Sequence, residues 1–196
     1  MPGFLAPGRK VRAGLPLINP KELAMVYKMS VVAAVAVTLF TGCAGIMPAK
    51  PVAQATLESR SGSQVKGVVS FYRSGDATLV QAELTGLTPG EHGFHVHESG
   101  DCSAPDAASA KGHFNPHGMK HGHHHHAERH VGDLPNLVAD AQGRVVYKAE
   151  VKGLNLAEGA DGIVGRSVVV HADPDDYRSQ PAGNSGRRVA CGVIKP

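Results

Sequence analysis

Two histidines separated by one residue lie near the middle of the chain, in the sequence Gly-Phe-His-Val-His-Glu at residues 93–98. In an extended strand successive side chains point to opposite faces, so His95 and His97 share one face while Phe94 and Val96 share the other. The apolar face can pack into a core, and the other face then holds two imidazoles at a fixed separation. Such a pair can bind one metal ion, because imidazole suits copper, zinc, iron and nickel. The alternative is a pair of solvent-facing histidines, and these six residues alone leave both interpretations open.

The rest of the chain has the composition of an all-β domain. Its 196 residues include 24 Gly and 13 Pro but no Trp, and short runs of Val, Ala and Leu are interrupted by Gly, Asn and Asp. This pattern is typical of short strands joined by turns. We predict strands over residues 64–72, 77–87, 93–98, 136–140, 143–153, 167–173 and 190–194. Such spacing predicts a sandwich or flattened barrel of about eight antiparallel strands.

The beginning of the chain reads as a targeting segment. Residues 31–40 are uncharged and apolar, follow Lys28 and precede the small residues Thr-Gly-Cys-Ala. This arrangement is typical of a secretory signal, and the apolar run is too short for a membrane span. We therefore interpret 1–43 as an N-terminal extension with a signal, 44–63 as a linker and 64–196 as the folded domain. The mature protein is expected in the periplasm.

Cys43 stands where a bacterial lipoprotein signal has its lipidated cysteine, although Phe40 occupies a place that Leu usually takes. A lipid on Cys43 would attach the mature protein to a membrane and would explain an odd number of cysteines in an exported chain. The alternative is ordinary signal cleavage near Ala44, or after residues 53–55, which removes Cys43 altogether. The sequence leaves both open.

The other two cysteines, Cys102 and Cys191, lie in the folded domain. Because an exported protein folds in an oxidising compartment, we expect a disulfide between them. The two are 89 positions apart, and closing so long a loop stabilises the folded state by roughly 4 to 5 kcal/mol in the chain-entropy model. The bridge would tie the loop that follows His97 to the last strand.

The charge gives no reason to expect a nucleic acid as partner. The chain carries a formal charge of +3, with five basic residues and one acidic residue before Cys43, so +4 belongs to the N-terminal segment. From Ala44 onward 15 basic and 16 acidic residues remain, a net charge of −1. A near-neutral domain lacks the positive surface that attracts phosphate backbones.

Two predicted connections, 99–135 and 174–188, are too long for hairpins, and long loops in compact domains are usually functional. The first holds three histidines and an aspartate that together make a closed set for a structural zinc: His113, His121, His130 and Asp133. His95, His97 and His171 remain for a second metal. Three or four imidazoles with an open position suit copper, which can change its oxidation state where zinc cannot.

Six blocks of the sequence follow one another with coherent spacing: His-Gly-Phe-His-Val-His-Glu (92–98), Gly-Asp-Cys (100–102), Gly-His-Phe-Asn-Pro (112–116), Glu-Arg-His-Val-Gly-Asp (128–133), Ser-Val-Val-Val-His-Ala (167–172) and Gly-Arg-Arg-Val-Ala-Cys-Gly-Val-Ile (186–194). These blocks closely resemble the copper/zinc superoxide dismutases, and the resemblance covers residues 64–194. The family implies a Greek-key β-sandwich. It implies copper bound by His95, His97, His113 and His171, and zinc bound by His113, His121, His130 and Asp133.

The resemblance also implies roles for three residues around these metals. His113 belongs to both ligand sets, so its imidazolate would bridge copper and zinc. Asp175 matches an acid that links a copper-ligand histidine to a zinc-ligand histidine and fixes their orientation, although Asp173 and Asp176 compete for this assignment. Arg188 matches the arginine beside the open copper position, where its permanent charge would attract the superoxide anion.

The implied reaction is the dismutation of superoxide to O₂ and H₂O₂, with copper alternately reduced and oxidised and with His113 as one proton source. The rival function is a metal-binding or metal-buffering protein on the same fold, which would require a lost copper ligand or a missing arginine. All of these residues are present. The oligomeric state stays open, with a homodimer among the alternatives.

The assignment of His121 rests on the resemblance, because four more histidines follow at 123–126. His121 lies eight residues after His113 and nine before His130, which matches the family's interval between zinc ligands. We expect 123–126 to form an exposed turn. It is either an auxiliary site that collects metal or a tolerated sequence drift in a loop.

Overall fold

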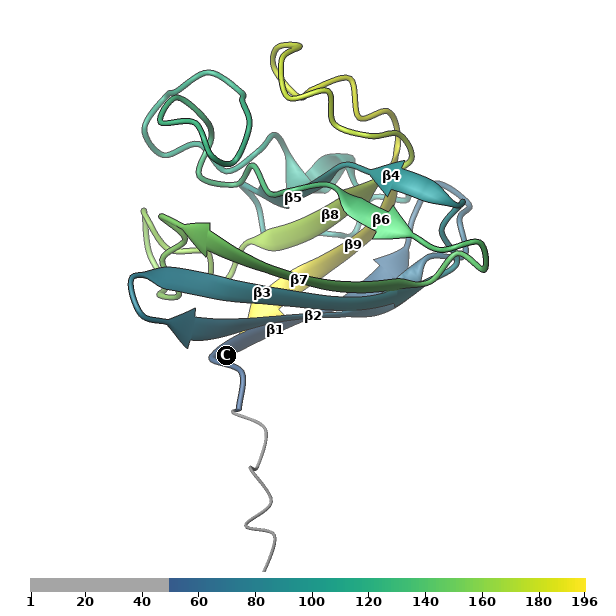
Figure 1. The fold of residues 1–196 in the computed structure, drawn as a ribbon, viewed down its shortest axis with the longest axis horizontal. Helices are drawn as coiled ribbons and strands as arrows, with labels where there is room; N and C mark the ends of the chain where they lie inside the picture. Colours follow the sequence, from purple (N-terminus) through teal and green to yellow (C-terminus); the bar gives the residue numbers. More distant parts are fainter. Residues whose placement is uncertain (1–49) are drawn as a thin grey trace, which may run out of the picture. The chain divides into compact units, whose positions relative to one another are not determined.

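The computed structural model describes residues 50–196 (Figure 1). The predicted signal at 1–43, including Cys43, and the first part of the expected linker lie outside the described residues. The nine strands of this part are β1 (Ala53–Ser59), β2 (Lys66–Ser74), β3 (Ala77–Thr85), β4 (Gly90–His92), β5 (Phe94–His97), β6 (Leu137–Ala139), β7 (Val145–Lys152), β8 (Ser167–His171) and β9 (Arg188–Lys195). A single 3₁₀ turn, Ala108–Ala110, interrupts the first long loop. Over residues 50–196 no helix has the length and apolar character needed to cross a membrane.

Every pairing among these nine strands is antiparallel. Seven strands form one sheet in the order β5-β8-β9-β1-β2-β3-β7, and β4 pairs with β6 in a separate ribbon. The large sheet curls, as Figure 1 shows, and both long loops rise on the same side of it. The pairs β3–β7 and β9–β1 join strands that are distant in sequence, which is typical of Greek-key connections. The predicted all-β antiparallel fold is confirmed.

Alternating residues build the core. In β3 the side chains of Thr78, Val80, Ala82 and Leu84 are buried while the residues between them are more exposed, as a strand with one face on the core requires. Strands β5 and β8 differ, because all their residues are buried. One face of this pair packs on the core and the other lies beneath the first long loop, so the sheet itself supplies the floor of a covered site.

The interpretation of residues 44–63 as a linker is wrong for its second half. Residues 53–59 form β1, which lies between β2 and β9 in the sheet. Ala53, Ala55 and Leu57 are buried and the residues between them are exposed. The alternation was present in the sequence, but alanine has a weak strand preference and gives little hydrophobic signal.

Backbone hydrogen bonds hold the first long loop on β5. The N–H of Val96 donates to Gly132 and the N–H of Phe114 donates to Val96, at 2.9 and 2.8 Å. Gly132 is required at this crossing, because a Cβ there would collide with the carbonyl oxygen of Val96. The loop is thus positioned as firmly as an additional strand.

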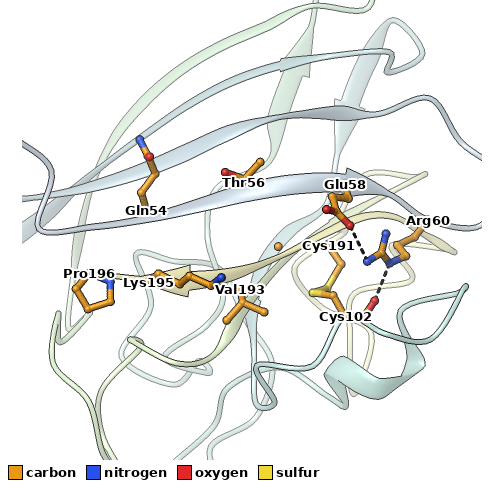
Figure 2. Close-up of a pocket in the computed structure, with 10 residues that line it drawn as sticks. Gln54, Thr56, Glu58, Arg60, Cys102, Cys191, Val193, Lys195 and Pro196 are labelled. Carbon is orange, nitrogen blue, oxygen red and sulfur yellow. Dashed lines mark hydrogen bonds and ion pairs between the residues drawn. A yellow bond between two sulfur atoms is a disulfide. The ribbon is translucent and has the colours of Figure 1, made fainter.

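The predicted disulfide between Cys102 and Cys191 is present, with a Cα–Cα distance of 5.7 Å. It connects the first long loop to β9 (Figure 2). Arg60 supports the same junction, because its Nε donates to the carbonyl oxygen of Cys102 at 2.8 Å and its guanidinium pairs with Glu58. The loop therefore has a covalent attachment at its start and backbone pairing farther along.

Candidate metal centre

His95 and His97 are fully buried, so the interpretation of this pair as solvent-facing is wrong. Phe94 and Val96 on the opposite face of β5 belong to the hydrophobic core, as expected. The loop backbone covers the histidine face through bridges that pair His97 with His113 and His95 with Asp133. The alternation of β5 places both histidines on one face, and the loop that covers this face brings its own predicted ligands next to them.

The predicted copper ligands form one cluster, with one donor atom from each residue and all four donors within 4.8 Å of one another: His95, His97, His113 and His171. Each ring has a buried nitrogen without a hydrogen-bond partner: Nδ1 of His95 and Nε2 of His97, His113 and His171. A buried polar atom normally has a partner. Four unpartnered imidazole nitrogens that converge are accounted for by a metal ion.

The other nitrogen of each ring is held in place. Nδ1 of His97 donates to the carbonyl oxygen of Lys111 at 2.9 Å, and Nδ1 of His171 lies 3.2 Å from that of Gly186. Metal-binding histidines usually donate their second N–H in this way, which fixes the tautomer and aims the lone pair. His92, which belongs to neither cluster, is buried, and its Nδ1 lies 2.9 Å from the carbonyl oxygen of His171.

The predicted zinc ligands form the second cluster: His113, His121, His130 and Asp133. Oδ1 of Asp133 lies 2.8, 3.0 and 3.3 Å from the Nδ1 atoms of His113, His121 and His130. Tetrahedral zinc with bonds of about 2.0 to 2.1 Å holds its ligand atoms roughly 3.3 Å apart, so these distances fit.

Nδ1 of His121 and Oδ1 of Asp133 lie 3.0 Å apart, yet this nitrogen is buried without a hydrogen-bond partner, because the geometry of the contact does not fit a hydrogen bond. A ring nitrogen and a carboxylate oxygen that lie this close without a hydrogen bond between them are arranged as two ligands of one cation.

Asp175 connects the two clusters. Its Oδ2 lies 2.8 Å from Nε2 of His95 and its Oδ1 lies 2.9 Å from Nε2 of His121. The competing aspartates, Asp173 and Asp176, are exposed and contact neither ring. The carboxylate therefore fixes one ring from each cluster at the same time.

Several residues that hold this arrangement were not identified from the sequence. Asn136 donates to the carbonyl oxygen of Asp175 and accepts from its N–H, both at 3.0 Å. Gln180 makes the same double contact with the backbone of His121, at 2.9 Å. Gly183 lies against Asp175 so closely that a Cβ would collide with the carboxylate. The hydrogen-bonded partners are 39 and 59 residues apart along the chain, so no local sequence pattern predicts these contacts.

The imidazoles of the first cluster are in the form that binds metals. Burial lowers the pKa of His95, His97 and His171, and burial together with the neighbouring His95 lowers the pKa of His113 to about 4. These rings are therefore neutral at neutral pH, and a neutral imidazole has a lone pair to give.

The second cluster is more polar. Burial alone would lower the pKa of His121, but the carboxylates of Asp133 and Asp175 outweigh it and raise the pKa to about 9. Burial would raise the pKa of Asp133, and its three histidine neighbours lower it well below its usual range instead. A cation at this position is thus favoured by a permanent negative charge. The chemistry of both donor sets fits the metals that the sequence predicts.

Arg188 lies beside the first cluster, opposite His171 in the pairing of β8 with β9. Its Nη1 donates to the carbonyl oxygen of Ala107 at 2.7 Å, and its side chain is half-buried. Ala107 lies in the loop segment that the disulfide anchors. The guanidinium is thereby positioned near the histidines, and its charge contributes to the low pKa of His97 and His171.

Comparisons with known proteins agree with this geometry. A family model described as copper/zinc superoxide dismutase matches residues 65–194. The chain is 40% identical over 137 residues to Superoxide dismutase [Cu-Zn] 2 of Aquifex aeolicus (strain VF5), which covers 67% of this chain and 80% of that protein. It is 42% identical over 149 residues to Extracellular superoxide dismutase [Cu-Zn] of Brugia pahangi, and this alignment covers 71% of this chain and 73% of that protein.

A solved structure, the crystal structure of the clock protein EA4, aligns with a TM-score of 0.67 at 39% identity, over 75% of this chain and 96% of that one. Fold, donor sets and sequence therefore agree on an oxidoreductase that uses copper and zinc. The chain belongs to the copper/zinc superoxide dismutase family.

Proposed function

We propose that the two clusters hold one copper and one zinc ion that share His113, and that superoxide reacts at the copper. Copper would be bound by His95, His97, His113 and His171, and zinc by His113, His121, His130 and Asp133. The observation that carries this proposal is the orientation of the His113 ring, whose unpartnered Nε2 faces the first cluster while Nδ1 lies in the second. One ring with a nitrogen in each donor set is what a bridging imidazolate requires.

The donor sets favour this order of the metals. The second set is closed by a carboxylate, has three imidazoles and is tetrahedral in its spacing, which suits a structural zinc. The first set contains imidazoles only, and such sets suit copper. Zinc would hold the loop and the His113 ring in position, while the chemistry takes place on the other side of that ring.

Dismutation converts two superoxide anions and two protons to O₂ and H₂O₂, so one anion is oxidised and the other is reduced. Copper would supply this exchange because it has two accessible oxidation states, whereas zinc has one. The chain would supply positioning and one of the two protons, and water would supply the other. Nε2 of His113 would take up a proton in the half-reaction that releases O₂ and give it up in the half-reaction that forms H₂O₂, while Nδ1 keeps the ring anchored.

Arg188 would attract the anion to this position. A guanidinium stays charged at every physiological pH and attracts an anion without itself titrating. Its contact with the carbonyl oxygen of Ala107 keeps the group from folding away from the site. Asp175 would act as a positioning residue for both metals through His95 and His121.

The division of the metals is tested with two variants. His171→Ala should abolish dismutation and lower the copper content while the zinc content stays near wild type, because His171 contributes to the first cluster only. Asp133→Ala should lower the zinc content and reduce activity less completely. His117→Ala is the matched control, since it removes an exposed histidine of the same loop. Equal zinc loss in the two cluster variants would contradict the division.

We also propose that the mature protein acts in the periplasm and is attached to a membrane through a lipid on Cys43. The apolar segment 31–40, the disulfide and a relative with the name extracellular support export. The intact mass of the mature protein purified from a bacterial envelope tests this directly. The expected mass is that of a chain whose first residue is Cys43 with a diacylglycerol group attached. A mass that corresponds to a chain whose first residue lies after Cys43 would exclude the lipid.

A homodimer is the oligomeric state that we propose. Its support is the exposure of two valines on neighbouring strands, Val138 on β6 and Val146 on β7, which are 62% and 90% exposed. Light scattering during size-exclusion chromatography should give twice the mass of the chain, and Val146→Lys should lower it. A single-chain mass for the wild type would contradict the proposal.

A further inference from the structure

Four consecutive histidines, residues 123–126, lie outside both buried clusters and have no part in the proposed function. They follow His121 and Gly122 in the first long loop. The N–H of His126 donates to the carbonyl oxygen of His123 at 2.7 Å, so the four residues form one tight turn. Their side chains therefore extend from a single short piece of backbone.

The rings of this histidine tract are close together. The ring centroids of His123 lie 4.1, 5.3 and 5.5 Å from those of His124, His125 and His126. For comparison, the three zinc-cluster imidazoles have centroids 5.3 to 5.5 Å apart. The separations of His123 from His125 and from His126 thus repeat the separation of imidazoles in the zinc cluster.

The tract is attached to the loop that carries Asp175. The Tyr177 ring packs edge-on against His123 with centroids 4.6 Å apart, and the N–H of Tyr177 donates to Asp175. A groove between the two loops is lined by His123 and His126 on one side and by residues 176–178 on the other. One wall of this groove is therefore fixed by the same residues that support the buried clusters.

The tract differs from the buried clusters in its access to solvent. His125 and His126 are exposed, and His123 and His124 are partly exposed, whereas the zinc ligands are buried. The tight groups of donor atoms among residues 50–196 are the two buried clusters. The tract would therefore close around a metal only after rotation of exposed rings, and its affinity should be lower than theirs.

We propose that the tract is a third metal site, which binds Zn²⁺, Cu²⁺ or Ni²⁺ from solution through His123, His125 and His126 and delivers Zn²⁺ to the buried cluster. Neutral imidazoles are good ligands for all three ions. The N–H of His125 donates to Nδ1 of His123 at 3.3 Å, so Nε2 is the nitrogen of His123 that would bind the metal. Delivery rests on the proposed role of His121, which is two residues away, but binding does not.

Binding is tested on protein that already holds copper and zinc, with Ni²⁺ alone as the probe. Native mass spectrometry should show one further Ni²⁺ on the wild type and on the control His117→Asn. The triple variant His123→Asn, His125→Asn, His126→Asn should lack it while it keeps its copper and zinc, which also shows that it is folded. No further Ni²⁺ on the wild type, or its retention by the triple variant, would overturn the site.

Delivery is tested by adding less than one equivalent of Zn²⁺ to metal-free protein and stopping the reaction with a chelator that removes weakly held metal. The triple variant should retain zinc several-fold more slowly than the wild type and His117→Asn. At excess Zn²⁺ the rates should converge. Equal rates at limiting zinc would overturn delivery. If the wild type retained no zinc after the chelator, the proposed zinc cluster would be the part that failed.

Discussion

Asp175 is the point at which the two metal clusters depend on one side chain. Its carboxylate is fully buried and holds Nε2 of His95 at 2.8 Å and Nε2 of His121 at 2.9 Å. In Asp175→Asn the shape is kept, but the amide accepts through one oxygen only and its NH₂ group faces the N–H of one ring. One ring then loses its acceptor, and the Nε2 atoms of both rings lose their charged partner.

We therefore expect Asp175→Asn to bind both copper and zinc more weakly than the wild type. Loss of an outer partner of a metal ligand costs about 10- to 100-fold in metal affinity, which corresponds to about 1.4 to 2.8 kcal/mol for each site. The assay is dialysis against increasing chelator, with copper and zinc measured in the retained protein. Asp173→Asn is the matched control, because it removes an equal charge from an exposed neighbour. Unchanged affinities for both metals, or an equal loss in the control, would refute this account of Asp175.

Three further variants test other parts of the structure. Breaking the Cys102–Cys191 bridge with Cys102→Ser releases an 89-residue constraint and should cost roughly 4 to 5 kcal/mol, or roughly 10 to 20 °C in Tm; a melting curve like that of the wild type would contradict it. Arg188→Ala should slow turnover at low ionic strength and make turnover depend less on salt. Arg187→Ala removes a charge at an exposed position and should change both quantities less. Equal slopes of turnover against ionic strength in the two variants would argue against steering by Arg188. Gly132→Ala forces a Cβ against β5 and should destabilise the protein by roughly 1 to 3 kcal/mol, which chemical denaturation measures; wild-type stability would show that the loop crossing tolerates a side chain.

The fold was predictable where the pattern was strong. The alternation in 93–98 predicted β5 and the two faces of its side chains, and the two cysteines predicted the disulfide. The structure confirms both. β1 was missed because Ala53 and Ala55 are small and carry little signal. The short strand β4 was missed because Gly90–His92 has three residues only and pairs with β6, far along the chain.

The site was predictable in its members but not in its supports. The grouping of the histidines into two sets came largely from the family resemblance, because spacing alone does not separate His121 from the tract that follows it. The structure brings every predicted ligand, together with Asp175, to its expected neighbours. The contacts of Gln180 with His121 and of Arg188 with the carbonyl oxygen of Ala107 join segments that are distant in sequence. Their partner atoms belong to the backbone, which every residue has, so the sequence does not mark them.

The most direct test is crystallography of the metal-loaded protein, with anomalous maps recorded above and below the copper and zinc absorption edges. We predict one copper peak bonded to Nδ1 of His95 and to Nε2 of His97 and His171, one zinc peak bonded to Asp133, and the His113 ring between them with a nitrogen toward each. Zinc at both positions after loading with both metals, or a His113 ring that contacts one metal only while the other site is filled, would contradict the shared-histidine centre.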